Sequence, residues 1–132
     1  MARLVVAVLG LILYWGGTAS AEWVKTGGTH KYDGYVDMST IAPTAQLVTM
    51  WTLKDFTVTR QIPAGDYRSV KTKRQYDCKN QRSRPLSVKY YAGQMAKGRL
   101  LFAGKGTREW SRVTPTSEGH AEMSIACKQP ST

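Results

Sequence analysis

An alternation of apolar and polar side chains with a period of two runs through the middle of this chain and limits what the chain can fold into. In Gln46–Phe56 (QLVTMWTLKDF) both alternating sets contain apolar groups, which is typical of a strand near the centre of a sheet. In Ser69–Cys78 and Leu86–Tyr91 one set is mostly apolar or aromatic, while the other is mostly polar or basic. These two strands are therefore expected to pack one face on a core and to show a basic face to solvent.

Short clusters of glycine, proline and aspartate separate the strands, among them Asp33–Gly34 and Arg84–Pro85. Connections this short join antiparallel neighbours. Three shorter strands are expected at residues 22–25, 34–38 and 99–103. The pattern thus predicts a mostly antiparallel sheet of about five to six strands.

The pattern changes after Pro115, where a short helix is expected over residues 117–128. Ser117 is a suitable N-cap, Glu118 stands in the first turn where the helix dipole favours an acid, and Lys128 closes the last turn. The expected fold class is therefore α+β, with the helix at the C-terminal end. The narrow stripe of this helix consists of Ala121, Ser124, Ile125 and Lys128, with Met123 and Cys127 beside it.

Residues 1–21 have the organisation of a cleaved secretory signal peptide: Arg3, then an apolar stretch, then small residues ending at Ala21. The apolar stretch has 12 residues, whereas a helix needs about 20 to cross a bilayer, so a signal peptide is favoured over a membrane anchor. No cysteine follows the stretch, so no lipid anchor is expected. Residues 22–132 are then expected to form one exported domain with no membrane span, periplasmic or secreted, and its association with the cell surface stays open.

Export determines the interpretation of Cys78 and Cys127, the two cysteines of the chain. An oxidising compartment joins such a pair, so a disulfide is expected, and it would tie the helix to the sheet. A metal site is the alternative, but it would need two further ligands, and His30 and His120 stand in no finger or ribbon spacing. No metal and no cofactor are therefore expected.

Basic side chains are concentrated in the middle strands. The chain has 19 Lys and Arg against 9 Asp and Glu, and residues 60–112 hold 14 basic side chains against three acidic ones. Two interpretations stay open: a solvated face that keeps the domain soluble, or a face that binds an acidic partner. Export argues against nucleic acid as the physiological partner. The candidate partner-binding residues are Arg68, Lys71, Lys73, Arg74, Lys79, Arg82 and Arg84.

Catalysis finds little support in the sequence, and no catalytic residue is assigned. His30 and His120 could form an acid and base pair only if the fold brought them together. The segment Gly98–Gly106 (GRLLFAGKG) differs from a phosphate-binding loop in glycine spacing, and it lacks the hydroxyl that magnesium requires. The three tryptophans that follow the expected signal peptide are interpreted as core or strand-packing residues, with sugar stacking as the alternative; they are Trp23, Trp51 and Trp110.

The order of several short motifs resembles the bacterial surface-adhesin protein E family. The resemblance extends over nearly all of residues 22–128, and it is carried by the ordered set rather than by any single motif. The matching segments are Gly34–Ile41, Val48–Asp55, Arg68–Lys71, Tyr76–Cys78, Tyr90–Tyr91, Gln94–Met95, Gly98, Trp110, Pro115–Ser117 and Ile125–Cys127.

This resemblance implies an antiparallel sheet with a C-terminal helix tied to it by a disulfide, and an adhesin that binds host matrix and serum proteins. Adhesins of this family are displayed through a lipid anchor, and this sequence departs from the family there because no anchoring cysteine follows the apolar stretch. It also implies that the basic strands around Cys78 are the partner-binding region. The leading hypothesis is a non-enzymatic exported binding domain that uses its basic face on acidic protein or polysaccharide surfaces, extracellular matrix proteins among them. A structural periplasmic protein without an adhesive role is the alternative, and a small hydrolase is the least favoured. An exposed sheet edge would allow two copies to pair.

Overall fold

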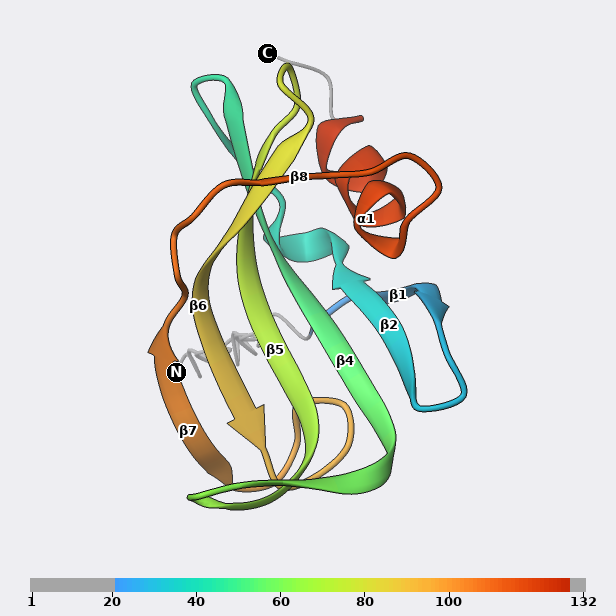
Figure 1. The fold of residues 1–132 in the computed structure, drawn as a ribbon, viewed down its shortest axis with the longest axis vertical. Helices are drawn as coiled ribbons and strands as arrows, with labels where there is room; N and C mark the ends of the chain where they lie inside the picture. The colour runs from blue at the N-terminus through green and yellow to red at the C-terminus, as the bar shows by residue number, and fades with distance from the viewer. Residues whose placement is uncertain (1–20, 129–132) are drawn as a thin grey trace, which may run out of the picture.

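The computed structural model describes residues 21–128 (Figure 1). The expected signal peptide, apart from Ala21, lies outside these residues. The elements in chain order are β1 (Trp23–Gly28), β2 (Tyr32–Asp37), the 3-10 helix η1 (Met38–Thr40), β3 (Ala42–Thr44), β4 (Leu47–Ile62), β5 (Gly65–Asp77), β6 (Arg82–Tyr91), β7 (Leu100–Lys105), β8 (Ser111–Arg112) and α1 (Glu118–Cys127).

One antiparallel sheet forms the body of the molecule, with the strand order β1-β2-β4-β5-β6-β7. The short strands β3 and β8 pair with β4 and β6. After β7 the chain crosses back over β6 through β8 and enters α1, which contacts β1, β4 and β5 (Figure 1). We call the side of the sheet that packs against α1 the helix face, and it carries Met50 and Tyr76. The opposite side is the outer face, and it carries Trp51, Lys71 and Lys89.

The predicted α+β class, the antiparallel pairing and the C-terminal helix are confirmed, but the predicted strand count is too low. The six expected strands all exist, and the sheet has 8 in total. The two additional strands have three and two residues, so they are too short to show an alternating pattern. These two segments, β3 and β8, are strands because they pair with the longer strands β4 and β6.

Two predicted turns are wrong, because both positions lie inside strands. Gly34 is buried in β2, and a Cβ at this position would collide with the Glu118 carboxylate. Glycine is therefore present here because the helix approaches the strand closely, and no turn is formed. Pro85 lies in β6, where the register with β5 shifts between Lys73 and Arg74. A bulge tolerates proline because a strand residue there can remain without a ladder hydrogen bond.

The core lies between α1 and the helix face of the sheet. Met50, Tyr76 and Ala126 are fully buried there, and Met123 is 3% exposed. The predicted stripe on the helix is correct only in part: Ile125 packs against the core, as do Met123 and Cys127 beside the stripe, but the buried helix residues are Glu122, Met123 and Ala126. A buried glutamate is not recognised by a pattern that searches for apolar side chains.

A disulfide and an N-cap hold the helix at its two ends. Cys78 and Cys127 are bonded, with their Cα atoms 5.8 Å apart, as expected. Ser117 is the N-cap, and its Oγ accepts a hydrogen bond from the backbone N of His120 at 3.1 Å. The helix thus has a covalent attachment beside its last turn and a capped first turn.

Candidate functional site

The outer face holds two like charges around an indole ring. Lys71 and Lys89 lie directly opposite each other on β5 and β6. Their Nζ atoms stand 4.6 Å and 5.5 Å from the centroid of Trp51, which lies on β4. Like charges at directly opposite positions are unfavourable, and contact with the ring offsets only part of that cost. Burial and the neighbouring Lys89 lower the pKa of Lys71, whereas Asp37 acts in the opposite direction. An anion at this place would relieve the repulsion.

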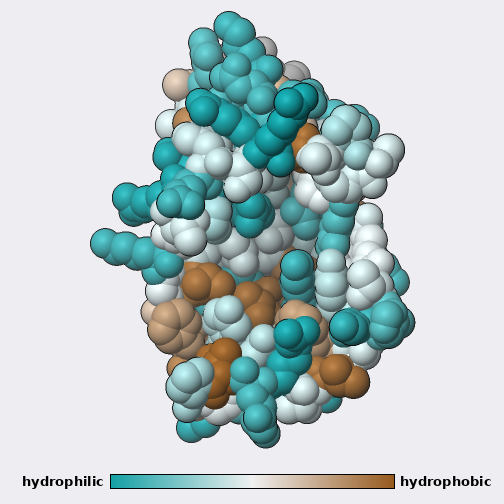
Figure 2. All heavy atoms as spheres, viewed as in Figure 1, coloured by the Kyte–Doolittle hydropathy of each residue, from teal (hydrophilic) through white to brown (hydrophobic). Residues whose placement is uncertain are grey.

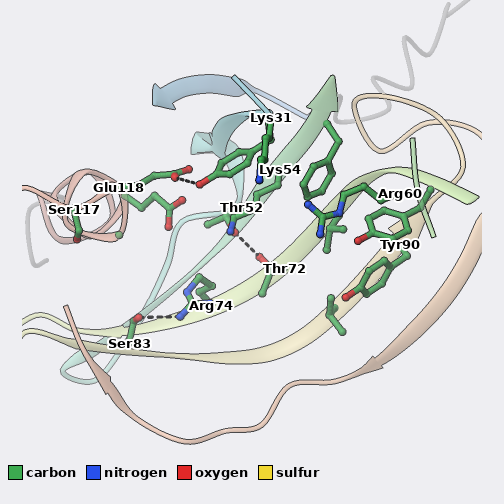
Figure 3. A pocket seen from close by; sticks show the side chains of 17 residues that line it. Lys31, Thr52, Lys54, Arg60, Thr72, Arg74, Ser83, Tyr90, Ser117 and Glu118 are labelled. Atoms are coloured by element: carbon green, nitrogen blue, oxygen red, sulfur yellow. Dashed lines mark hydrogen bonds between the residues drawn. The ribbon is translucent and has the colours of Figure 1, made fainter. Parts of the chain in front are cut away.

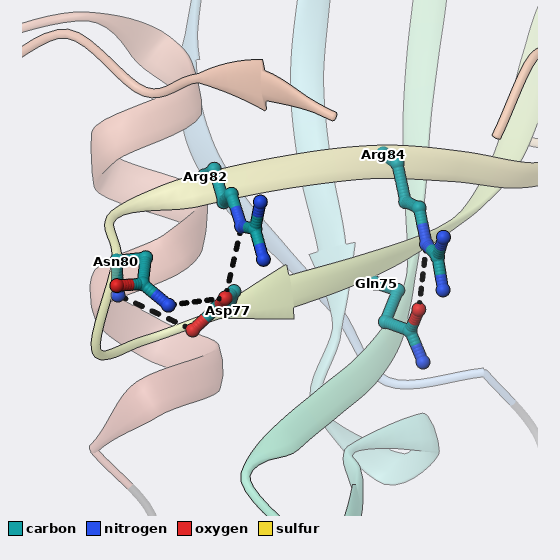
Figure 4. Close-up of polar contacts among 5 residues, drawn as sticks. All are labelled: Gln75, Asp77, Asn80, Arg82 and Arg84. Atoms are coloured by element: carbon teal, nitrogen blue, oxygen red, sulfur yellow. Dashed lines mark hydrogen bonds and ion pairs between the residues drawn. The ribbon is translucent and has the colours of Figure 1, made fainter. Parts of the chain in front are cut away.

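A second indole ring contacts two arginines of β6. The Arg82 and Arg84 guanidinium carbons stand 4.5 Å and 4.3 Å from the Trp110 ring centroid. The two arginines have different polar partners (Figure 4). Arg82 Nε donates to Asp77 Oδ2 at 2.9 Å, whereas Arg84 Nε donates to the neutral Gln75 Oε1 at 2.8 Å. The charge of Arg82 is therefore balanced, and that of Arg84 is not balanced by its hydrogen-bond partner.

Asp77 also organises the turn between β5 and β6. It accepts hydrogen bonds from the side chain and the backbone N of Asn80 (Figure 4). The side-chain hydrogen bond from Asn80, followed by that from Arg82, lowers the pKa of Asp77 below its usual value. This carboxylate is thus committed to holding Arg82 and the turn.

The seven predicted partner-binding residues do not share one face. Lys71, Lys73, Arg82 and Arg84 lie on the outer face, in alternating positions of two adjacent strands. Arg74 lies on the helix face, where its Nη2 donates to Ser83 Oγ at 3.1 Å. Arg68 donates to the carbonyl oxygens of Phe56 and Thr57, and Lys79 is exposed in the turn after β5.

The helix face contains an open cleft of about 670 Å³ between the sheet and α1 (Figure 3). Its polar end is built by two glutamates one helical turn apart. Tyr32 Oη donates to Glu118 Oε2 at 2.6 Å, and Tyr76 Oη donates to Glu122 Oε2 at 3.4 Å. Lys54 stands over the Tyr32 ring, with its Nζ 4.8 Å from the ring centroid. The cleft therefore combines carboxylates, phenols and cations.

Burial and these hydrogen bonds change the pKa values of three side chains in and beside the cleft. Burial, reinforced by the Glu118 charge, raises the pKa of Glu122 to about 7, although Arg74 opposes the shift. The hydrogen bond to Glu118 raises the pKa of Tyr32 to about 12. Burial and the Glu122 charge also raise the pKa of Tyr76. Glu122 is thus the group of this cleft that changes protonation near neutral pH.

Aromatic rings continue from the cleft across five strands. Neighbouring ring centroids are 4.9 to 5.9 Å apart, in tilted or edge-on geometry. Figure 2 shows apolar side chains gathered over the lower half of the face that Figure 1 presents, with hydrophilic ones above them. The row consists of Tyr32, Phe56, Tyr67, Tyr90 and Phe102.

No hydrogen bond links the side chains of His30 and His120 in the part of the chain that the structure describes. Within residues 21–128, no cluster of three His, Cys, Asp or Glu side chains could hold a metal ion. The helices described there are also too short or too polar to cross a bilayer.

Sequence reasoning missed the cleft and Lys89. The i, i+4 spacing of Glu118 and Glu122 on an expected helix was the available signal for the glutamate pair. Lys89 could have been found from its place in Leu86–Tyr91, a strand whose polar set was expected to face solvent. Trp51 and Trp110 are partly buried, and both also carry cations on their rings, which their interpretation as packing residues did not include.

Comparisons with known proteins agree on one fold. The family model described as Surface-adhesin protein E matches residues 23–128. The selenomethionine form of Haemophilus influenzae protein E superposes with a TM-score of 0.61 at 16% identity, over 82% of this chain and 95% of that chain. A second crystal form of that protein gives a TM-score of 0.58 at 18% identity, over 83% and 96%. No curated protein matches the sequence.

Proposed function

Because this chain belongs to the surface-adhesin protein E family, we propose that it is an exported, non-enzymatic binding domain whose outer face binds acidic protein or polysaccharide surfaces. The signal peptide of residues 1–21 would be removed, and residues 22–132 would act as one domain. Extracellular matrix proteins and their sulfated polysaccharides have the chemistry that this face would recognise. Membership of an adhesin family favours binding over catalysis and export over an internal location.

The observation that carries the proposal is the cross-strand pair of Lys71 and Lys89 over Trp51. Lys73 and Arg84 extend the same face, so four cations lie on two adjacent strands. We call Lys71, Lys73, Arg84 and Lys89 the cation patch. Two of these cations are two residues apart along β5 and the other two lie on the neighbouring strand β6, so one extended anionic partner could contact several of them.

The carboxylates near the cation patch have other partners. Asp37 accepts hydrogen bonds from the backbone N atoms of Glu22 and Ser39, and Asp77 pairs with Arg82. Among the described residues, Asp37 attracts Lys71 but forms no ion pair with it, so an external carboxylate or sulfate would find cations that are not paired with these acids. Such contacts weaken as salt screens the charges.

The test compares the oxidised protein with a Lys71→Gln, Lys73→Gln, Arg84→Gln variant in binding to immobilised heparin and matrix proteins near physiological salt. The matched control is Lys25→Gln, Lys54→Gln, Lys128→Gln, which removes the same charge from exposed positions outside the cation patch. We expect saturable, salt-sensitive binding that the patch variant loses by about tenfold or more and that the control retains.

Equal loss in both variants would mean that net charge alone attracts polyanions. Absent or salt-independent binding in the unaltered protein would favour the structural periplasmic protein. Either result would remove the cation patch from the function.

A further inference from the structure

The end of the sheet that carries the turns after β1, β4 and β6 exposes several large apolar side chains. Val58 is 59% exposed, Leu100 46% and Phe102 48%. These are three of the four large apolar side chains that are exposed among the described residues. An apolar hollow of about 290 Å³ lies beside them, lined by Ile62, Pro63, Ala64, Tyr90 and Phe102. We call this region the hairpin end.

The hairpin end is also basic. Lys31, Arg60, Lys97 and Arg99 are exposed on it, against two carboxylates, Asp66 and Asp33, and Asp33 is already paired with Lys25 at 3.1 Å. Asp55 is buried there and accepts a hydrogen bond from the backbone N of Met95 at 2.8 Å. Exposed apolar side chains beside several cations are the combination that favours binding at the interface of an anionic membrane.

We propose that the hairpin end docks on the surface of a bilayer that contains anionic lipids. Val58, Leu100 and Phe102 would enter the headgroup region, and the cations would contact lipid phosphates. These residues are distinct from the cation patch, so this inference does not depend on the proposed function.

A second copy of the chain is the competing occupant of the same apolar surface. In a twofold dimer each copy presents the same patch, so the cations of one copy would face those of the other. Because Asp33 is paired with Lys25, Asp66 is left as the carboxylate that could face the four cations of the other copy, and such a contact is more repulsive than complementary. A lipid surface offers the opposite charge, and the geometry therefore favours lipid.

The test measures sedimentation of the oxidised protein, purified from cells that express the full chain, with two kinds of vesicle. One kind is phosphatidylcholine alone, and the other contains equal amounts of phosphatidylcholine and phosphatidylglycerol. We expect binding to the anionic vesicles only. Val58→Ser with Leu100→Ser, and separately Lys97→Gln with Arg99→Gln, should each reduce the partition coefficient by about tenfold or more.

Two control variants alter similar side chains elsewhere. Val24→Ser changes the fourth exposed apolar side chain, at 39% exposure, and Lys79→Gln with Lys105→Gln removes two exposed cations. Neither should change the partition coefficient, and circular dichroism establishes that all variants are folded. Absence of binding to anionic vesicles, or equal loss in the controls, would overturn the proposal. Light scattering provides a further test, because it measures whether the protein is a dimer. If the double variant Val58→Ser, Leu100→Ser is a monomer while the unaltered protein is a dimer, and if vesicle binding is unchanged, the surface serves self-association and the proposal is refuted.

Discussion

Replacement of Glu122 by glutamine should make the protein more stable in mildly alkaline solution and change how its stability depends on pH. Glu122 is 9% exposed between α1 and the sheet. Glu118, Arg74, Tyr76 and Lys54 all act on its carboxyl group, but burial is the largest influence. The net effect raises its pKa from 4.5 to about 7 in the folded protein.

The sign and size of the effect follow from the two pKa values. Between pH 4.5 and about 7 the folded protein retains a proton that the unfolded chain has lost. The stabilisation is therefore complete below pH 4.5 and disappears as pH rises through about 7. A shift of this size corresponds to roughly 3 kcal/mol. Glutamine cannot ionise and can still accept the Tyr76 hydrogen bond, so Glu122→Gln should gain up to about 3 kcal/mol over the unaltered protein near pH 8.

Urea unfolding, followed by tryptophan fluorescence from about pH 4 to about pH 8, measures both free energies of unfolding. The difference between the two proteins isolates the contribution of Glu122, because the other titrating groups are common to both. Glu109→Gln serves as control, since Glu109 is exposed and should leave the profile unchanged. Parallel profiles for the unaltered protein and Glu122→Gln would refute the reasoning, because they would mean that Glu122 titrates alike in both states.

Two further predictions concern how the helix is held. Cys78→Ser with Cys127→Ser should lower the free energy of unfolding in urea by about 4 kcal/mol, from the entropy of a loop that spans 49 positions, and a loss below about 1 kcal/mol would contradict this. Gly34→Ala should displace the Glu118 carboxylate, which would move the pKa of Tyr32 from about 12 back toward 10.0 and cost about 1 to 3 kcal/mol. Ultraviolet titration of the tyrosines measures the first effect, with Tyr32→Phe to identify the signal, and an unchanged titration would refute the contact.

The strands could be predicted wherever one side of the sheet differs in polarity from the other. Ser69–Cys78 satisfies this condition and overlaps β5, whereas Gln46–Phe56 was recognised by the apolar groups on both of its sides and overlaps β4. Gly34 and Pro85 misled the prediction because local preference favours turns there, whereas the close approach of Glu118 and the register shift in β6 determine the outcome. These are contacts between distant parts of the chain, which a local pattern does not contain.

The cation patch was partly predictable, and the cleft was not. Alternation within β5 correctly groups Lys71 with Lys73 and separates Arg74 from them. The alternation in Leu86–Tyr91 places Lys89 on the polar side of its strand, but its position opposite Lys71 depends on the register between β5 and β6, which the sequence does not fix. Glu122 was missed for another reason, because a glutamate on a helix is normally assigned to the solvent side. Only the approach of the Tyr76 hydroxyl and the surrounding burial give it a place in the interior.

The disulfide that closes α1 onto β5 also constrains the order in which the protein can be assembled. Cys78 precedes Cys127 by 49 positions, so a chain that emerges from its N-terminus presents the first thiol well before the second. The pairs β2-β4, β4-β5, β5-β6 and β6-β7 can form in that interval without the helix. Because the chain has two cysteines, a single intramolecular pairing exists, and no isomerase is needed to correct a wrong one. The sheet can therefore be paired before the disulfide closes, and the competing side reaction is a disulfide between two chains.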